Sequence, residues 1–139
     1  MRELSALSSR LSGGRMADSF RDLVVWQEAM ALATDVYRST NGFPRSEIYG
    51  LTGQLRRAAV GVPSDITEGK GRLSKKEFIQ FLAKARGSLC EVDTQLEISK
   101  NLEFLDAADF ERLSKQSSKV GRRLNALITS IQRSLRAES

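Results

Sequence analysis

The stretch FIQFLAKARGSLCEVDTQLEIS, residues 78–99, decides the fold of this chain. Its buried-type residues recur at alternating intervals of four and three, which is the spacing of one helix face that packs along another helix. The preceding SKKE has the form of a capping box, in which Ser74 and Glu77 satisfy the first free amides of a helix. We therefore predict a helix over 74–101. Its expected seam is Phe78, Leu82, Ala85, Leu89, Val92, Leu96 and Ser99.

The same period continues on both sides of this helix, and no run of period-two alternation longer than a few residues indicates a strand. Asp106 is in position to cap a further helix. We predict the other helices near 20–40, 46–69 and 107–136. Their expected seams are Val25, Ala29, Leu32 and Val36; Ile48, Leu51, Leu55, Ala58, Val62 and Ile66; and Phe110, Leu113, Ser117, Val120, Leu124, Leu127 and Ile131.

Short links join these segments. Asn41-Gly42 and the pair Gly69 and Gly71 are helix stops. Links of about five residues place consecutive long helices side by side and antiparallel. The expected fold is all-α, an antiparallel up-down-up-down four-helix bundle. Pro63 should bend the second helix; the alternative is a break at this point.

The composition removes many enzyme mechanisms. The 139 residues contain no His and one Cys, Cys90. Catalysis through His, His metal ligands and an intrachain disulfide are therefore excluded. We expect no catalytic residue, no metal site and no cofactor, and hence not an enzyme. Cys90 belongs to a stripe of small residues together with Ala83, Gly87 and Thr94. We expect this stripe to allow close packing of a neighbouring helix.

The two ends of the chain differ in character. Residues 1–18 are rich in Ser and Arg and lack the organised helical pattern, so we interpret them as a flexible tail, with Met16 as an alternative start. Residues 19–139 form the bundle domain. No apolar run approaches the roughly 20 residues that span a bilayer, and no secretory signal is present. We expect a cytoplasmic protein without a membrane partner.

Basic residues gather near the C-terminus. The net charge is +5, and residues 112–137 contain seven Lys and Arg and no acid. The series starting at Arg112 follows the fourth seam by two positions, about 200° round the helix, so we expect it to face solvent and to be free for phosphates. The alternative is a solvated face whose cations favour a helix C-terminus. The candidate nucleic-acid-binding residues are Arg112, Lys115, Lys119, Arg122, Arg123 and Arg133, and Arg136 extends them.

The turn before residue 77 is a second basic segment. Four cations fall within seven residues: Lys70, Arg72, Lys75 and Lys76. They precede a helix N-terminus, where backbone amides favour a phosphate. The spacing is not that of a Walker loop, and an ordinary solvated turn is the alternative.

The first helix carries two apolar stripes instead of one. The second stripe is Trp26, Met30, Ala33 and Tyr37, and other apolar residues lie beside their seams: Ile79, Ile98, Phe104, Ile128 and Leu135. Extra stripes favour a second buried surface between identical chains, with a wide core face as the alternative. The aromatic residues Trp26, Tyr37 and Tyr49 are predicted to be core residues and not base-stacking platforms.

Several short segments of the sequence, taken together, resemble a known family. They are LVVWQEAM (23–30), FP (43–44), YGLTGQLRRAAV (49–60), EGKGR (68–72) and EFIQFLAKARGSL (77–89). The chain resembles the four-helix bundle protein family, also called the 23S rRNA intervening-sequence protein family, whose members are small bacterial proteins. The likeness runs from about Leu23 to Leu105. The segment VPSDIT (62–67) departs from the motif Ile-Pro-x-Asn-Ile-Ala that is commoner in this family.

The resemblance implies a bundle that assembles into a homopentamer. It also implies kinship with the accessory protein of diversity-generating retroelements, a basic pentamer that binds nucleic acid and the reverse transcriptase. The family has no established enzymatic activity. We therefore expect a homo-oligomer that binds RNA or structured duplex through phosphate contacts. The alternative is a protein–protein adaptor that docks an acidic or nucleic-acid-bound partner.

Overall fold

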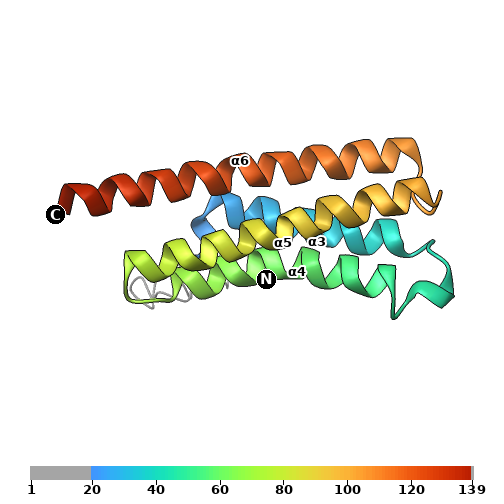
Figure 1. Ribbon diagram of the computed structural model, residues 1–139, viewed down its shortest axis with the longest axis horizontal. Helices are drawn as coiled ribbons and strands as arrows, with labels where there is room; N and C mark the ends of the chain where they lie inside the picture. Colours follow the sequence, from blue (N-terminus) through green and yellow to red (C-terminus); the bar gives the residue numbers. More distant parts are fainter. Residues whose placement is uncertain (1–19, 139) are drawn as a thin grey trace, which may run out of the picture.

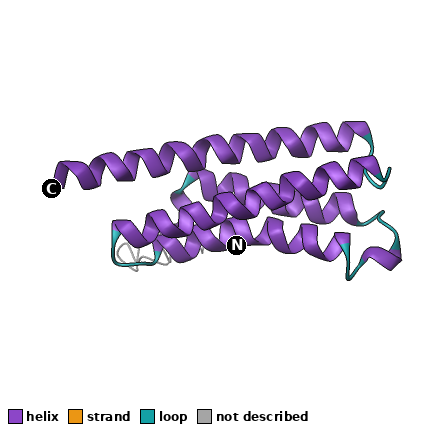
Figure 2. Ribbon diagram, viewed as in Figure 1, coloured by secondary structure: helices purple, strands orange, loops and turns teal. Residues whose placement is uncertain are grey.

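The computed structural model describes residues 20–138, which form four long α-helices and two short 3-10 helices (Figure 1). With the labels of Figure 1, the long helices are α3 (Val24–Thr40), α4 (Leu51–Lys70), α5 (Lys75–Asn101) and α6 (Ala107–Glu138). The 3-10 helices are η1 (Phe20–Asp22) and η2 (Arg45–Glu47). No strand occurs in residues 20–138, where every element is helical (Figure 2). The predicted all-α fold is confirmed, whereas the predicted tail, residues 1–18, lies outside the described part.

The helices alternate in direction and enclose one core. Each of α3 and α5 packs against both α4 and α6, so the four helices form a closed cycle of neighbours (Figure 1). The C-terminal end of α6 extends past the turn that joins α4 and α5. The largest fully buried side chains come from all four helices: Leu32, Val36, Leu55, Val62, Ile66, Leu82, Val92, Leu96, Leu113, Val120 and Leu124.

The predicted seams match this core except at their ends. In α5 every seam residue from Leu82 to Ser99 is buried, and Phe78 packs half-buried against the core. In α6 the seam holds from Leu113 to Leu124, but Ile128 is then buried where Leu127 was expected. A straight helix has 3.6 residues per turn, so its buried face drifts away from a strict 3.5-residue repeat after several turns.

The second helix begins later than predicted. The segment around 46 forms η2, and α4 starts only at Leu51 after the Tyr49-Gly50 turn. A carboxylate oxygen of Glu47 accepts the Leu51 N–H at 3.2 Å, which satisfies one of the free amides at the helix start. Ile48 is therefore exposed instead of belonging to the seam.

The predicted caps of α5 and α6 are present. The Glu77 N–H donates to Ser74 Oγ at 3.1 Å, and the Asp109 N–H donates to Asp106 Oδ1 at 2.8 Å. Both side chains thus replace a backbone acceptor that the first turn lacks. Ser74 and Asp106 therefore set where α5 and α6 begin.

Glycines of α4 allow α5 to approach closely. A Cβ atom at Gly69 would lie 2.7 Å from Phe81 Cβ, and one at Gly61 would lie 3.1 Å from Ser88 Oγ. Between these glycines α4 continues without a break through Pro63. The expected role of the small-residue stripe on α5 is wrong for the described residues. Its members are exposed, and nothing described lies within 4 Å of a Cβ built at Gly87: Ala83, Gly87, Cys90 and Thr94.

Candidate nucleic-acid interface

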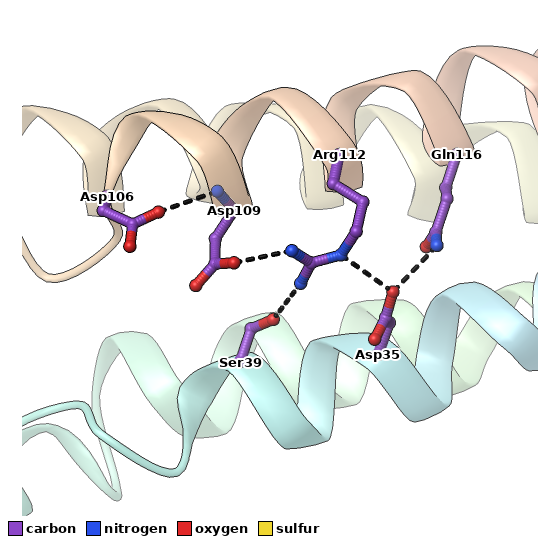
Figure 3. Close-up of polar contacts among 6 residues, drawn as sticks. All are labelled: Asp35, Ser39, Asp106, Asp109, Arg112 and Gln116. Carbon is purple, nitrogen blue, oxygen red and sulfur yellow. Dashed lines mark hydrogen bonds and ion pairs between the residues drawn. The ribbon is translucent and has the colours of Figure 1, made fainter.

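The first cation of α6, Arg112, is held against α3. Its guanidinium donates to Asp109 Oδ1 at 2.6 Å, to Asp35 Oδ2 at 3.2 Å and to Ser39 Oγ at 2.9 Å (Figure 3). Gln116, one turn further on, also donates to Asp35 Oδ2 at 2.8 Å. The hydrogen bonds to Asp109 and then Asp35 raise the pKa of Arg112 above its usual value. This side chain joins α6 to α3.

A second contact of the same kind lies further along α6. Glu28 of α3 forms ion pairs with Lys119, whose Nζ is 3.0 Å from Oε2, and with Arg123. The Glu28 side chain is only 14% exposed, so its charge needs these two partners. Because Glu28 and Asp35 are seven residues apart, both lie on the face of α3 that meets α6.

The predicted outward line of cations is therefore divided into two sets. The expectation that all its members are free of acids is wrong for Arg112, Lys119 and Arg123, which close the α3–α6 contact. The long side chains of these three residues reach sideways from α6 to the neighbouring helix α3. Residues on the flank of a seam then meet the acids of α3.

Three basic residues of α6 remain directed to solvent. Arg122 and Arg133 are exposed and have no carboxylate within 4.0 Å among residues 20–138, whereas Arg136 has a partner of its own. Lys115 lies 3.8 Å from Glu111, with both side chains mostly exposed. Such exposed pairs contribute little and yield readily to another anion. Lys115 and Arg122 also line a shallow hollow of about 500 Å³ on the outer side of α6.

The basic turn is partly neutralised as well. Arg72 pairs with Glu68 at 3.2 Å and with Glu77 at 4.0 Å. Lys75 reaches Glu138 and, at 2.7 Å, Ser134 Oγ, so it ties the start of α5 to the end of α6. Lys70 lies 5.7 Å from the ring centre of Phe78. Lys76 is exposed and has no polar partner among the described residues.

The second apolar stripe of the first helix lines a groove between α3 and α4. This α3–α4 groove has a volume of about 680 Å³. Met30, Tyr37 and Val60 on its walls are substantially exposed. Within the stripe, Ala33 is buried and Trp26 packs half-buried against the core, as expected of a core residue, whereas Met30 and Tyr37 are exposed. The prediction that Tyr37 is a core residue is therefore wrong. The groove is lined by Trp26, Met30, Ala33, Thr34, Tyr37, Val60, Pro63, Ser64, Thr67 and Glu68.

The other apolar residues outside the seams behave differently. Ile128 is buried, and Ile79 and Phe104 pack against the same core. Leu135 is half-buried, and Ile98 is exposed. For most of them the wide core face, which was the alternative, is the correct interpretation.

A third basic region, which was not predicted from the sequence, lies near the link between α3 and α4. Four arginines lie there: Arg38, Arg45, Arg56 and Arg57. A local charge count would have found them, because residues 36–64 contain these four cations and one acid, Glu47. The expectation that Tyr49 belongs to the core is also wrong, since 95% of this residue is exposed.

One carboxyl group lies inside the bundle. Asp65 of α4 is buried, 3.5 Å from Ser88 Oγ and 3.9 Å from Lys84 Nζ. Burial raises the pKa of Asp65 above its usual value, because the charged form loses solvation; the nearby positive charge of Lys84 opposes this shift.

Residues 20–138 lack two further kinds of feature. No three His, Cys, Asp or Glu side chains converge there in a group that would hold a metal ion. None of the helices in that range is long and apolar enough to cross a membrane.

Comparison with known proteins identifies the family. The sequence pattern of the family described as 23S rRNA-intervening sequence protein matches residues 21–126. The chain therefore belongs to this family. No curated protein matches it.

A solved structure shows the same fold. It is a protein of unknown function of the S23 ribosomal protein family from Bacteroides thetaiotaomicron, with a TM-score of 0.71 and 19% sequence identity. The alignment covers 76% of this chain and 96% of that one.

Proposed function

We propose that the protein is a non-enzymatic homo-oligomer that binds nucleic acid, RNA or structured duplex, through phosphates on the outer side of α6. One observation carries this proposal: three exposed cations on this side have no close carboxylate partner among the described residues or only a long, exposed one. Arg122 and Arg133 have none, and Lys115 lies 3.8 Å from Glu111. Free guanidinium and ammonium groups on a rigid helix favour phosphate contacts with little reading of bases. A cytoplasmic location is part of the same proposal.

Self-association supports this function because three cations on one chain bind a polyanion weakly. The α3–α4 groove offers the apolar surface for contact with a second copy. It lies on α3 and α4, whereas the free cations lie on α6, so association through the groove leaves the cations exposed. Repeating them around an oligomer multiplies weak contacts through effective concentration. The family resemblance makes five copies the expected number.

The test is the salt dependence of binding. We expect Arg122→Gln with Arg133→Gln to weaken binding to a duplex RNA. The slope of log affinity against log salt should become shallower by about 0.9 for each phosphate that the variant no longer binds. The matched control is Arg86→Gln with Lys100→Gln on α5, which changes the net charge equally. An unchanged slope in the α6 variant, with helicity retained, would show that this face does not bind the phosphates.

The second candidate function is a protein–protein adaptor, and the α3–α4 groove favours it. In that case the groove holds a partner protein and the cations of α6 attract its acidic or nucleic-acid-bound surface. This function predicts no appreciable affinity for naked nucleic acid at moderate salt. The same salt titration therefore separates the two functions.

A further inference from the structure

The link between α3 and α4 gathers positive charge that nothing described in the chain neutralises. Arg38 lies in the last turn of α3, Arg45 lies in η2, and Arg56 and Arg57 lie in the second turn of α4. None of these four has a carboxylate within 4.0 Å among the described residues. The nearby acid, Glu47, accepts the Leu51 N–H at 3.2 Å and so caps α4 instead. The α3–α4 link is therefore locally basic.

One of these arginines is held in place against an aromatic ring. Arg56 donates to Thr40 Oγ1 at 2.8 Å, to Asn41 Oδ1 at 3.2 Å and to the Tyr37 carbonyl at 3.3 Å. Its guanidinium carbon lies 4.7 Å from the centre of the Tyr37 ring. The stacked pair is thus ordered before any ligand arrives, which lowers the entropy cost of binding.

A small hollow opens next to this pair. It has a volume of about 290 Å³ and is lined by Tyr37, Ile48, Gly53, Arg56, Arg57 and Val60. Sites for small molecules begin at roughly this size, so it suits one planar group and not a large ligand. Gly53 is required here, because a Cβ at this position would lie 2.7 Å from the Ile48 carbonyl oxygen. The close approach keeps Ile48 at the edge of the hollow.

Two exposed tyrosines belong to this region, of which Tyr37 lines the hollow. Tyr49 directly follows Ile48 and is 95% exposed, and Tyr37 is 45% exposed. Aromatic rings next to free arginines are the features with which proteins bind single-stranded nucleic acid, because every base presents a face that stacks. A solvated phosphate-binding face alone has no need of such rings.

We propose that this surface, formed by Tyr37, Tyr49, Arg56 and Arg57, binds an unpaired nucleotide of a nucleic-acid strand. The base stacks at the hollow and its phosphate pairs with Arg57, which is exposed and has no polar partner among residues 20–138. The inference rests on the proposed function and names the form of nucleic acid preferred. Tyr37 borders the α3–α4 groove as well, but Tyr49 and Arg57 do not line it. A second copy in the groove therefore leaves these two residues available.

The test compares a single-stranded RNA that carries one 2-aminopurine with an RNA duplex of the same length. We expect Tyr49→Ala and Arg57→Gln each to lower affinity for the single strand by about fivefold or more, while affinity for the duplex changes less than twofold. Tyr49→Phe keeps the ring and should retain single-strand affinity. Leu73→Ala is the control, because Leu73 is an equally exposed apolar residue, 96%, at the other end of the bundle. Thermal unfolding checks that every variant is folded.

Three outcomes would overturn the inference. Equal losses for single strand and duplex would show a general charge effect. A loss in Tyr49→Phe as large as in Tyr49→Ala would exclude stacking. Displacement of the RNA by polyglutamate at equal charge concentration would assign the surface to acidic peptides.

The same titrations separate this inference from the proposed function. Duplex binding that depends on Arg122 and Arg133, without any effect at Tyr49 or Arg57, removes the inference and leaves the function. If neither RNA binds at moderate salt, both are wrong.

Discussion

At the scale of single residues, Asp65 combines an ionisable group with burial at the α4–α5 contact. It lies on the inner side of α4, close to Ser88 and Lys84 of α5. Burial raises its pKa, so the folded protein holds this proton to a higher pH than the unfolded chain does. Protonation therefore stabilises the fold, and this contribution is lost as the pH rises through the folded-state pKa.

Asp65→Asn should remove this pH-dependent loss. We expect the difference in free energy of unfolding, variant minus wild type, to increase as the pH rises from about 3.5 towards 7. Urea unfolding at several pH values measures the difference, and Glu111→Gln, at an exposed carboxyl, is the control. A difference that shrinks with rising pH would show that Lys84 outweighs burial.

At the scale of the elements, the sequence predicted the four helices well because their signals are local. The caps at Ser74 and Asp106 and the seam spacing each depend on residues within one or two turns. The start of α4 was predicted too early because the preceding residues, which form η2 and a turn, have the same apolar spacing as a helix. Glu47 of η2 accepts the Leu51 N–H, so α4 begins only after this turn. The shift to Ile128 was missed because a strict heptad was extended too far.

The contact between α4 and α5 yields a prediction from two glycines. Gly69→Ala places a Cβ 2.7 Å from Phe81 Cβ and should destabilise the protein by about 1–3 kcal/mol. Gly87→Ala meets nothing described within 4 Å and should stabilise by roughly 0.5–1 kcal/mol, since alanine favours the helix interior. Urea unfolding measures both. A loss of stability at Gly87 would indicate that another surface packs on this stripe.

At the scale of the whole molecule, the sequence predicted which basic residues the candidate site contains, but not which of them form ion pairs with acids. The number of cations on the last helix can be read from the sequence, whereas their partners, Asp35 and Glu28, lie 77 or more positions away along the chain. Only the folded chain shows which cations are neutralised. The exposure of Tyr49 was missed for a similar reason, since an isolated aromatic residue in a turn carries no periodic signal.

Glu28→Gln tests the consequence of this arrangement. The change leaves Lys119 and Arg123 without their carboxylate, so we expect a loss of about 1–2 kcal/mol of stability, between the values for exposed and buried pairs. The two freed cations should at the same time raise affinity for duplex RNA at low salt. Urea unfolding and RNA binding measure the two effects, and Glu91→Gln on α5 is the charge-matched control. Lower stability with unchanged affinity would place the α3 side of α6 outside the interface.

The single tryptophan of the chain lies on the wall of the α3–α4 groove, in edge contact with Phe20 at 5.2 Å between ring centres. Its fluorescence is consequently an intrinsic optical probe of that groove. Dilution that separates copies joined there should shift its emission to longer wavelength, whereas RNA bound at the outer side of α6 should leave it unchanged. Assembly and ligand binding can thus be followed separately in the unlabelled protein.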